Sequence, residues 1–352
     1  MCLYALKEMT SSYKRANSST FMCFLDASKA FDKVNHRKLF NKLKQRKVPM
    51  VIIRILSFWY SNQTMRIRWD GILSKPFQVT NGVRQGGIIS AFLFNVYMDD
   101  LSKKLNSYNI GCFVGNSLIN HLLYADDLLL ISPSANGLRI LLRTCENYAD
   151  QFDITFNPDK STILISREKA IKDVPYKFYI NSVQLKEKFK VKYLGHILTN
   201  ELKDDEDILR ECRTIYAKAN MLTRQFFMCN DIVKTRLFQS FFSTFYTAQL
   251  WWKYNVASIK KLIVAYNNSL RMFFNISRYE SASMMVAVKS VNGCSSIIRK
   301  LIYRFMQRLN CSENNIIKEI RKSDMIKRSD IWKHWSSLLF TKNNNSDILT
   351  VT

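Results

Sequence analysis

The pattern of apolar and polar residues divides the chain near residue 200. Before that point, apolar runs of strand length alternate with stretches in which apolar residues recur at the helical period, whereas beyond residue 230 the pattern predicts helices only. A compact apolar run at residues 21–26 predicts a central strand. Residues 119–132 contain two more apolar runs separated by Tyr-Ala-Asp-Asp, which predicts a hairpin with this tetrapeptide at its tip.

A helix followed by a second hairpin is predicted between these two regions. The helix covers residues 51–60, with one face formed by Ile52, Ile55, Leu56 and Trp59. Apolar and polar residues alternate at residues 64–69, which predicts a strand. Asp70-Gly71 supplies a turn, and the chain is predicted to return as a strand from Phe77.

The C-terminal part of the chain is predicted to be helical. The run Lys203-Asp-Asp-Glu-Asp207 contains four acidic residues that suit the first turn of a long helix, because carboxylates interact favourably with the helix dipole there. The longest uncharged run, Leu237–Trp252, is too short and too polar for a comfortable membrane span, so we predict a buried helix and no membrane association. Residues 341–352 are predicted to be a polar tail.

Charge and cysteine usage narrow the function class. The chain has 53 Lys and Arg against 28 Asp and Glu, a formal net charge of +25, which predicts binding to a polyanion and favours nucleic acid over an acidic membrane surface. The eight cysteines form no close pairs with metal-ligand spacing, and only four histidines are present, which argues against structural zinc. Free thiols in a reducing compartment are expected, and hence an intracellular location, nuclear or cytoplasmic.

Three carboxylates stand at the ends of predicted strands. Asp26 ends the first strand, and Asp126 and Asp127 lie at the hairpin tip. If these strands neighbour each other in one sheet, the three side chains come together, and unpaired carboxylates are costly to bury without a compensating cation. Mg²⁺ prefers hard oxygen ligands, and two such ions can align a phosphoryl displacement. Taken one at a time, each Asp also suits a helix cap or a turn.

Five segments, in order and at matching spacing, resemble the motifs of reverse transcriptases from non-LTR (LINE-type) retrotransposons of the jockey or CR1 kind. They are Phe24–Asp32, Gly82–Leu101, Tyr124–Asp127, Asn157–Ser161 and Tyr193–Gly195. The resemblance covers roughly residues 5–200, and the helical remainder resembles the thumb region of these elements. It implies an α+β fold: a right-hand polymerase palm, in which an antiparallel sheet packs on helices, with incomplete fingers and an α-helical thumb.

The resemblance also implies roles for individual residues. Asp26, Asp126 and Asp127 match the catalytic, metal-binding carboxylates, which implies two Mg²⁺ ions, with Mn²⁺ as the alternative metal. Phe31 matches the bulky residue that leaves no room for a ribose 2′-hydroxyl. Lys160 matches a catalytic lysine that assists departure of pyrophosphate. The nucleotide-binding loop is matched by Arg84, Gln85 and Gly86, and the primer grip by Tyr193, Leu194 and Gly195.

Four further charged or titratable residues fit the family pattern without an implied catalytic role. Asp32 and His36 are expected to support the first motif structurally. Asp99 and Asp100 are expected to lie on a helix surface and not to bind metal.

The implied activity is RNA-directed DNA polymerisation, with an RNA template, a DNA primer and deoxynucleoside triphosphates as partners; no stable protein partner is predicted. The implied organisation is a palm with partial fingers at residues 1–200, an α-helical thumb and C-terminal helical region at 201–340, and the tail. Basic stretches at residues 37–47, 167–192 and 299–328 could hold a nucleic-acid backbone electrostatically.

Only about 25 residues precede Asp26, where members of this family carry a fingers region and an endonuclease. We therefore expect an N-terminally truncated element. Three alternatives to an active reverse transcriptase are left open. The first is a non-catalytic, nucleic-acid-binding remnant. The second is an RNA-dependent RNA polymerase, against which Phe31 and the Arg-Gln-Gly-Gly loop argue. The third is a decayed copy without function.

Overall fold

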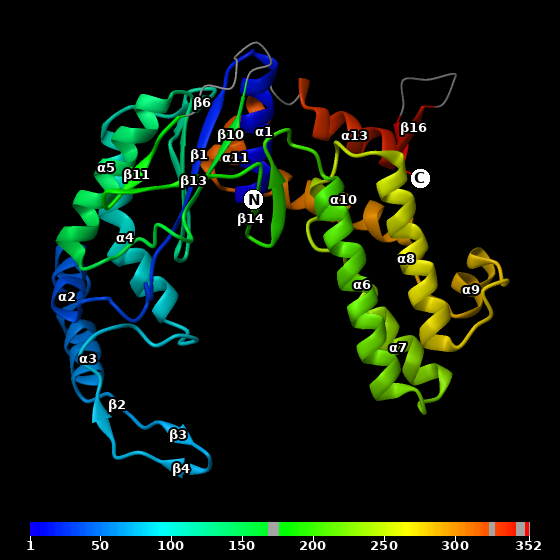
Figure 1. Ribbon diagram of the computed structural model, residues 1–352, viewed down its shortest axis with the longest axis horizontal. Helices are drawn as coiled ribbons and strands as arrows, with labels where there is room; N and C mark the ends of the chain where they lie inside the picture. The colour runs from blue at the N-terminus through cyan, green and yellow to red at the C-terminus, as the bar shows by residue number, and fades with distance from the viewer. Residues whose placement is uncertain (168–175, 324–327, 343–348, 352) are drawn as a thin grey trace. The chain divides into compact units, whose positions relative to one another are not determined.

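The computed structural model describes residues 1–167, 176–323, 328–342 and 349–351, so residues 168–175 and 324–327 of two predicted basic stretches lie outside the described residues. The chain forms two compact units (Figure 1). One comprises residues 17–113 and 118–188 and is called the sheet unit; the other comprises residues 1–16, 114–117 and 189–352 and is called the helical unit. This division differs from the predicted boundary at residue 200, because the hairpin at residues 190–199 packs within the helical unit, against the long helix α6 (Asp205–Phe226).

The sheet unit is built on five strands. In spatial order they are β13 (Lys186–Glu187), β10 (Thr162–Ser166), β1 (Thr20–Asp26), β9 (Asp127–Ser132) and β8 (His121–Tyr124). The predicted strand at residues 21–26 is therefore confirmed as the central one. It pairs antiparallel with β9 on one side and β10 on the other, and six of its seven residues are buried. Only β13 is parallel to its neighbour.

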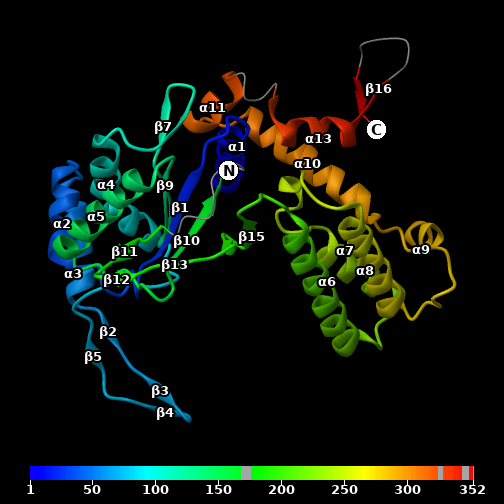
Figure 2. The same ribbon diagram turned by 45° about the horizontal axis from the view of Figure 1, so that its top comes forward.

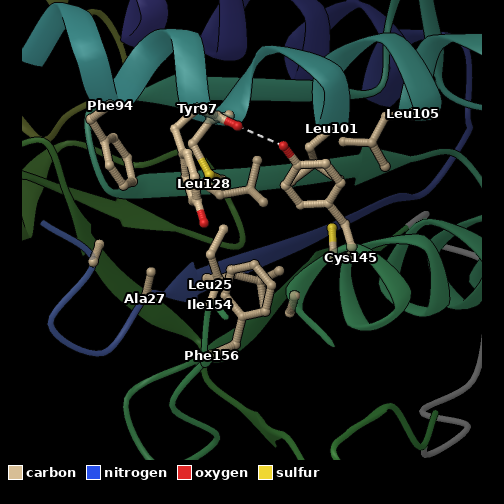
Figure 3. Close-up of a cluster of buried hydrophobic side chains, with 14 of the residues drawn as sticks. Leu25, Ala27, Phe94, Tyr97, Leu101, Leu105, Leu128, Cys145, Ile154 and Phe156 are labelled. Carbon is tan, nitrogen blue, oxygen red and sulfur yellow. Dashed lines mark hydrogen bonds between the residues drawn. The ribbon is translucent and has the colours of Figure 1, made fainter. Parts of the chain in front are cut away.

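Among the described residues, four helices complete the sheet unit (Figure 1). They are α2 (His36–Gln45), α3 (Met50–Ser61), α4 (Ser90–Ser107) and α5 (Ala135–Phe152). The sheet face that carries Leu25 and Leu128 packs in one apolar cluster with Tyr97 of α4 and Cys145 of α5 (Figure 3). This cluster explains why the short strands hold together: burying a Leu or Tyr side chain contributes roughly 1.5–3 kcal/mol each. Helix α5 begins after Ser134, whose hydroxyl caps it by accepting a hydrogen bond from the Gly137 amide.

The predicted helix at residues 51–60 is confirmed as α3, but its predicted apolar face is wrong in part. The residues that it buries are Ile53, Leu56 and Tyr60. Ile52, Ile55 and Trp59 are instead exposed. Apolar residues occur on several sides of this helix, so the sequence period alone could not select the side that packs.

The predicted hairpin after α3 forms a two-stranded arm at residues 62–79 (Figure 2). Its four strand pieces are β2 (Thr64–Met65), β3 (Arg68–Trp69), β4 (Ile72–Leu73) and β5 (Phe77–Gln78). β3 pairs with β4 across the Asp70-Gly71 turn, and β2 pairs with β5. Short two-stranded pairs also join β6 (Cys112–Val114) to β7 (Ser117–Ile119) and β11 (Tyr179–Ile180) to β12 (Val183–Gln184).

The helical unit begins with α1 (Cys2–Arg15) and continues after residue 188. Its hairpin consists of β14 (Lys190–Tyr193) and β15 (His196–Thr199). Its later helices are α6 (Asp205–Phe226), α7 (Asp231–Phe242), α8 (Val256–Phe274), α9 (Ala282–Val288), α10 (Cys294–Asn310), α11 (Asn315–Lys322) and α13 (Asp330–Leu339), with a 3-10 turn, η1, at Ala248–Leu250. Acidic residues do occupy the first turn of α6, as predicted.

Two C-terminal predictions need correction. The helix predicted at Leu237–Trp252 ends at Phe242, because the chain turns before η1 and Thr247 adopts a left-handed conformation with φ of 64°. Residues 340–342 and 349–351 pair as strands β16 and β17, where a polar tail was predicted. Within the described residues, none of the helices has the length and hydropathy needed to cross a bilayer.

Candidate active site

Strand pairing brings the three predicted carboxylates to one end of the sheet. Asp26 and Asp127 are direct partners in the antiparallel ladder between β1 and β9, a pairing in which Cα atoms lie about 4.5–5.5 Å apart. Tyr124 pairs with Asp127 in the adjacent ladder, so Ala125 and Asp126 form the two-residue tip of the predicted hairpin. Ala125 has a φ of 53°, as a tight turn of this kind requires.

The carboxylates repel each other. Partial burial, followed by the charges of Asp126 and Asp26, raises the pKa of Asp127. The Nζ atom of Lys160 lies 4.0 Å from a carboxylate oxygen of Asp26, but these side chains are 69% and 40% exposed, so solvent screens the pair. The negative charge of the cluster is therefore compensated little by the protein itself.

The segment that carries Lys160 is fixed to the end of β1. The Asp26 amide donates a hydrogen bond of 3.1 Å to the Ser161 hydroxyl, and the Asn157 amide donates one of 2.8 Å to the Asp26 carbonyl. These contacts hold the predicted Asn157–Ser161 motif beside the carboxylates. Ser161 was not among the predicted site residues, and only its place in that motif could have indicated it.

The donor set suits Mg²⁺, because it consists of three carboxylates with little internal compensation. Within the described residues, no three His, Cys, Asp or Glu side chains already converge as a ready ligand group. Convergence of Asp26, Asp126 and Asp127 on an ion therefore needs changes of side-chain rotamer, which exposed Asp residues can make readily. A bound cation would also relieve the repulsion that raises the pKa of Asp127.

Phe31 and the glycine-containing loop are assembled side by side. The Phe31 ring stacks on Phe94 of α4, with centroids 4.8 Å apart and an interplanar angle of 19°. The Val83 amide donates a 2.7 Å hydrogen bond to the Phe31 carbonyl, and the Gly82 amide donates a 2.8 Å bond to the Val34 carbonyl. A Cβ atom at position 82 would lie 2.8 Å from the Asp32 carbonyl oxygen, and Gly82 has a φ of +91°, so the close approach requires glycine.

Asp32 and His36 support this loop by direct contacts. The Nε2 atom of His36 lies 2.7 Å from the Gly82 carbonyl oxygen, and the Gln85 side-chain amide donates a 3.4 Å hydrogen bond to Asp32. Arg84, Gln85 and Gly86 are exposed. A pocket of about 550 Å³ is lined by residues on this loop and at the base of the arm, including Asp32, Gln63, Met65, Phe77, Arg84 and Gln85.

The predicted primer grip belongs to the helical unit. Tyr193 is buried, and Leu194 and Gly195 form the turn between β14 and β15, with φ values of 45° and 78°. The Tyr246 hydroxyl donates a 2.8 Å hydrogen bond to the Leu194 carbonyl, and a Cβ atom at position 195 would lie 2.6 Å from the Tyr246 ring. Tyr246 was not among the predicted site residues, and no motif includes it.

Asp99 and Asp100 lie on α4, and both form ion pairs with basic residues. Asp99 pairs with Arg46 and Lys103, and Asp100 with Lys42 and Lys103. Their pKa values are lowered: burial opposes the shift, but hydrogen bonds from these cations outweigh it. Paired carboxylates of this kind are structural and contrast with the uncompensated cluster at the sheet end.

Comparison with known proteins identifies relatives of this chain. The sequence model of the family described as "Reverse transcriptase (RNA-dependent DNA polymerase)" matches residues 3–198. The chain is 32% identical over 184 residues to the "Retrovirus-related Pol polyprotein from type-2 retrotransposable element R2DM" of Drosophila melanogaster, which covers 50% of this chain and 17% of the relative. It is 24% identical over 309 residues to the "RNA-directed DNA polymerase from mobile element jockey" of Drosophila funebris, covering 85% and 33%.

Among solved structures, apo telomerase from Candida tropicalis is similar, with a TM-score of 0.43 and 14% identity over 93% of this chain and 55% of that chain. The chain spans between about a sixth and a third of the length of the two curated relatives. The family match covers more than half of the chain and includes the three Asp residues, Phe31 and the loop at residues 82–87.

Proposed function

We propose a function from the premise that this chain belongs to the reverse transcriptase (RNA-dependent DNA polymerase) family. It carries the RNA-directed DNA polymerase domain of a non-LTR retrotransposon and copies an RNA template by adding deoxynucleotides to a DNA primer. The observation that carries this proposal is the pairing of Asp26 with Asp127 beside Asp126, with little compensating charge. No disulfide joins any of the eight cysteines, all of which lie within the described residues; this supports a reducing compartment, and we propose the nucleus or the cytoplasm.

Asp26, Asp126 and Asp127 are the residues that would hold two Mg²⁺ ions. Such ions, when bound, supply charge neutralisation for the triphosphate and lower the pKa of the attacking primer hydroxyl. Lys160 is the nearby cation and would offset charge on the departing pyrophosphate. Arg84, Gln85 and Gly86 would contact the incoming nucleotide, and Tyr193, Leu194 and Gly195 would contact the primer.

Primer extension on an RNA template with Mg²⁺ tests this function. The wild-type chain is expected to extend the primer, and Asp126→Asn is expected to lower the rate on the order of 10³-fold, because one oxygen-donor charge is lost from the site. Asp99→Asn is the matched control, since it removes a carboxylate that is already ion-paired. Extension by Asp126→Asn at the wild-type rate would contradict the proposal, as would binding of template and primer without incorporation of a single deoxynucleotide by the wild type.

Phe31 provides a second test of the same site. We propose that its ring, supported by Phe94, excludes a ribose 2′-hydroxyl. Phe31→Ala is expected to raise the relative incorporation of ribonucleotides about 10- to 100-fold, a range typical of discrimination by the shape of a pocket. The measurement is the ratio of kcat/KM for a ribonucleotide and its deoxy counterpart. A wild-type preference for ribonucleotides would instead favour an RNA polymerase.

A further inference from the structure

We propose that the arm at residues 62–79 and the adjoining exposed side of α3 form a binding surface for single-stranded nucleic acid. The inference rests on the proposed function, because it assigns the unpaired strand that approaches the same site. The arm extends from the end of α3, away from the helices of its own unit (Figures 1 and 2).

The arm exposes large apolar side chains that a stable isolated structure would not leave in water. All residues from 64 to 78 are exposed, and Ile67, Trp69 and Ile72 retain 60%, 81% and 76% of their accessible surface. An isolated two-stranded hairpin is marginally stable, and contiguous exposed apolar surface marks an interaction site. The end of α3 continues this surface with Phe58 and Trp59, which are 73% and 59% exposed. We therefore infer that this surface binds a partner that covers its aromatic rings.

The charges of the same segment favour nucleic acid as that occupant. Residues 50–79 contain four basic side chains and one acidic one, Asp70. The basic ones are Arg54, Arg66, Arg68 and Lys75. A second copy of the chain also carries a net charge of +25, so self-association through this surface would be opposed by repulsion. Exposed rings interleaved with arginines instead suit unpaired bases, which stack on the rings while the phosphates contact the cations.

The surface is continuous with the proposed nucleotide loop. The base of the arm, through Gln63, Met65 and Phe77, lines the same 550 Å³ pocket as Arg84 and Gln85. Residues 64–69, which precede the turn of the arm, span at most about 17 Å when extended, enough to contact several nucleotides. The geometry therefore points to the template strand ahead of the copied position as the segment that the arm holds.

The test measures binding of a labelled single-stranded RNA without nucleotides, so that catalysis is not required. Replacing residues 66–73 by an Asn-Gly turn is expected to raise Kd at least about tenfold, and Trp69→Ser about 5- to 100-fold, because each stacked base contributes roughly 1–3 kcal/mol. Trp69→Phe keeps an aromatic face and is expected to bind within a few-fold of wild type. Arg66→Ala with Arg68→Ala should lower the slope of log Kd against log salt by about 1.4.

The control removes two exposed charges elsewhere in the sheet unit. Lys104→Ala with Arg143→Ala, two exposed positions outside the arm and the basic stretches, should leave the Kd for single-stranded RNA unchanged. Matching thermal unfolding curves will show that each variant is folded. Unchanged RNA affinity in the shortened-arm variant overturns the proposal. So does a Trp69→Ser variant that changes from dimer to monomer in light scattering while its RNA affinity stays the same, because the arm is then a protein interface.

Primer extension by the same variants separates this inference from the proposed function. Normal extension together with arm-independent RNA binding refutes the inference alone. Arm-dependent RNA binding by a wild-type chain that incorporates no nucleotide refutes the proposed function alone.

Discussion

Two carboxylate clusters in this chain have the same residue type and opposite electrostatics. In the sheet unit, Asp26, Asp126 and Asp127 lie at the end of a sheet, repel each other, and have one solvent-screened lysine nearby. In the helical unit, Asp204 at the N-cap of α6 and Asp207 in its first turn are 1% and 0% exposed and are surrounded by donors and cations. The first cluster is left for an external cation, whereas the second is neutralised by the protein.

The helical cluster connects parts of the chain that are distant in sequence. Asp204 forms a buried salt bridge with Lys7 of α1. Asp207 accepts hydrogen bonds from the Arg210 guanidinium at 2.7 Å, the Trp251 indole at 2.8 Å and the Ile197 amide at 3.0 Å, and lies 3.0 Å from the His196 ring. Burial alone would raise the pKa of both carboxyls, but these partners outweigh it and lower both.

The difference in charge compensation distinguishes a functional carboxylate from a structural one. Buried charge is tolerated where partners satisfy it, and removing one partner is then costly. A cluster that the protein does not satisfy implies a ligand that will. The clusters can therefore be distinguished by experiment, from the largest expected effect to the smallest.

Asp207→Ala should cause the largest change in stability. It leaves the buried His196 and the partly buried Arg210 without this carboxylate, and the expected loss in the free energy of unfolding is about 3–5 kcal/mol. Urea unfolding followed by circular dichroism measures it. Glu313→Ala, at a fully exposed position of the same unit, is the control and should leave the midpoint unchanged. Equal stability of the two variants would remove the contrast between the clusters.

Mg²⁺ should stabilise the chain through the sheet cluster. At a tenfold excess over Kd, one bound ion raises the free energy of unfolding by about 1.4 kcal/mol. The shift should disappear in Asp127→Asn and persist in Asp99→Asn, whose carboxylate is already paired with Arg46 and Lys103. Thermal unfolding with and without Mg²⁺ measures it, and a shift retained by Asp127→Asn would place the ion elsewhere.

Acidification should affect the two clusters in opposite directions. The lowered pKa values of Asp204 and Asp207 give stability that is present above the ordinary Asp pKa of about 3.9 and is lost as the pH falls below it. The raised pKa of Asp127 means that the folded state binds its proton first, so acidification toward that pKa relieves a destabilising charge. Without divalent ions, Asp127→Asn should exceed wild type in stability at pH 7, and the gap should close toward pH 4. A gap that does not vary with pH would contradict this assignment.

Lys160→Met should have the smallest effect on stability. Its ammonium is 4.0 Å from Asp26 and is mostly solvated, so the change in the free energy of unfolding should stay within about 0.5 kcal/mol. A loss comparable with that of Asp207→Ala would show that the lysine compensates the sheet cluster after all. Urea unfolding of the variant beside wild type gives the comparison.

Much of the sheet unit could be predicted from sequence because its signals are local. Apolar runs bounded by turn residues identified β1 and the hairpin, and the position of each Asp at a strand end implied that the three would meet. The face of α3 could not be predicted, because apolar residues surround that helix and only packing selects Ile53, Leu56 and Tyr60. The exposure of the arm could not be predicted either, because alternation of apolar and polar residues predicts a strand but does not show whether another element covers it.

The sequence by itself determined the elements that depend on neighbouring residues: the strand period, the hairpin turn and the order of the five motifs. Tertiary structure alone decided which charges are satisfied. Lys7 and Asp204 are 197 positions apart, and no local sequence pattern predicts that they pair. The acidic run at residues 203–207 was predicted as a favourable helix start, yet folding converts two of its members into a buried, neutralised network, because the electrostatic environment of a carboxylate is set by what packs around it.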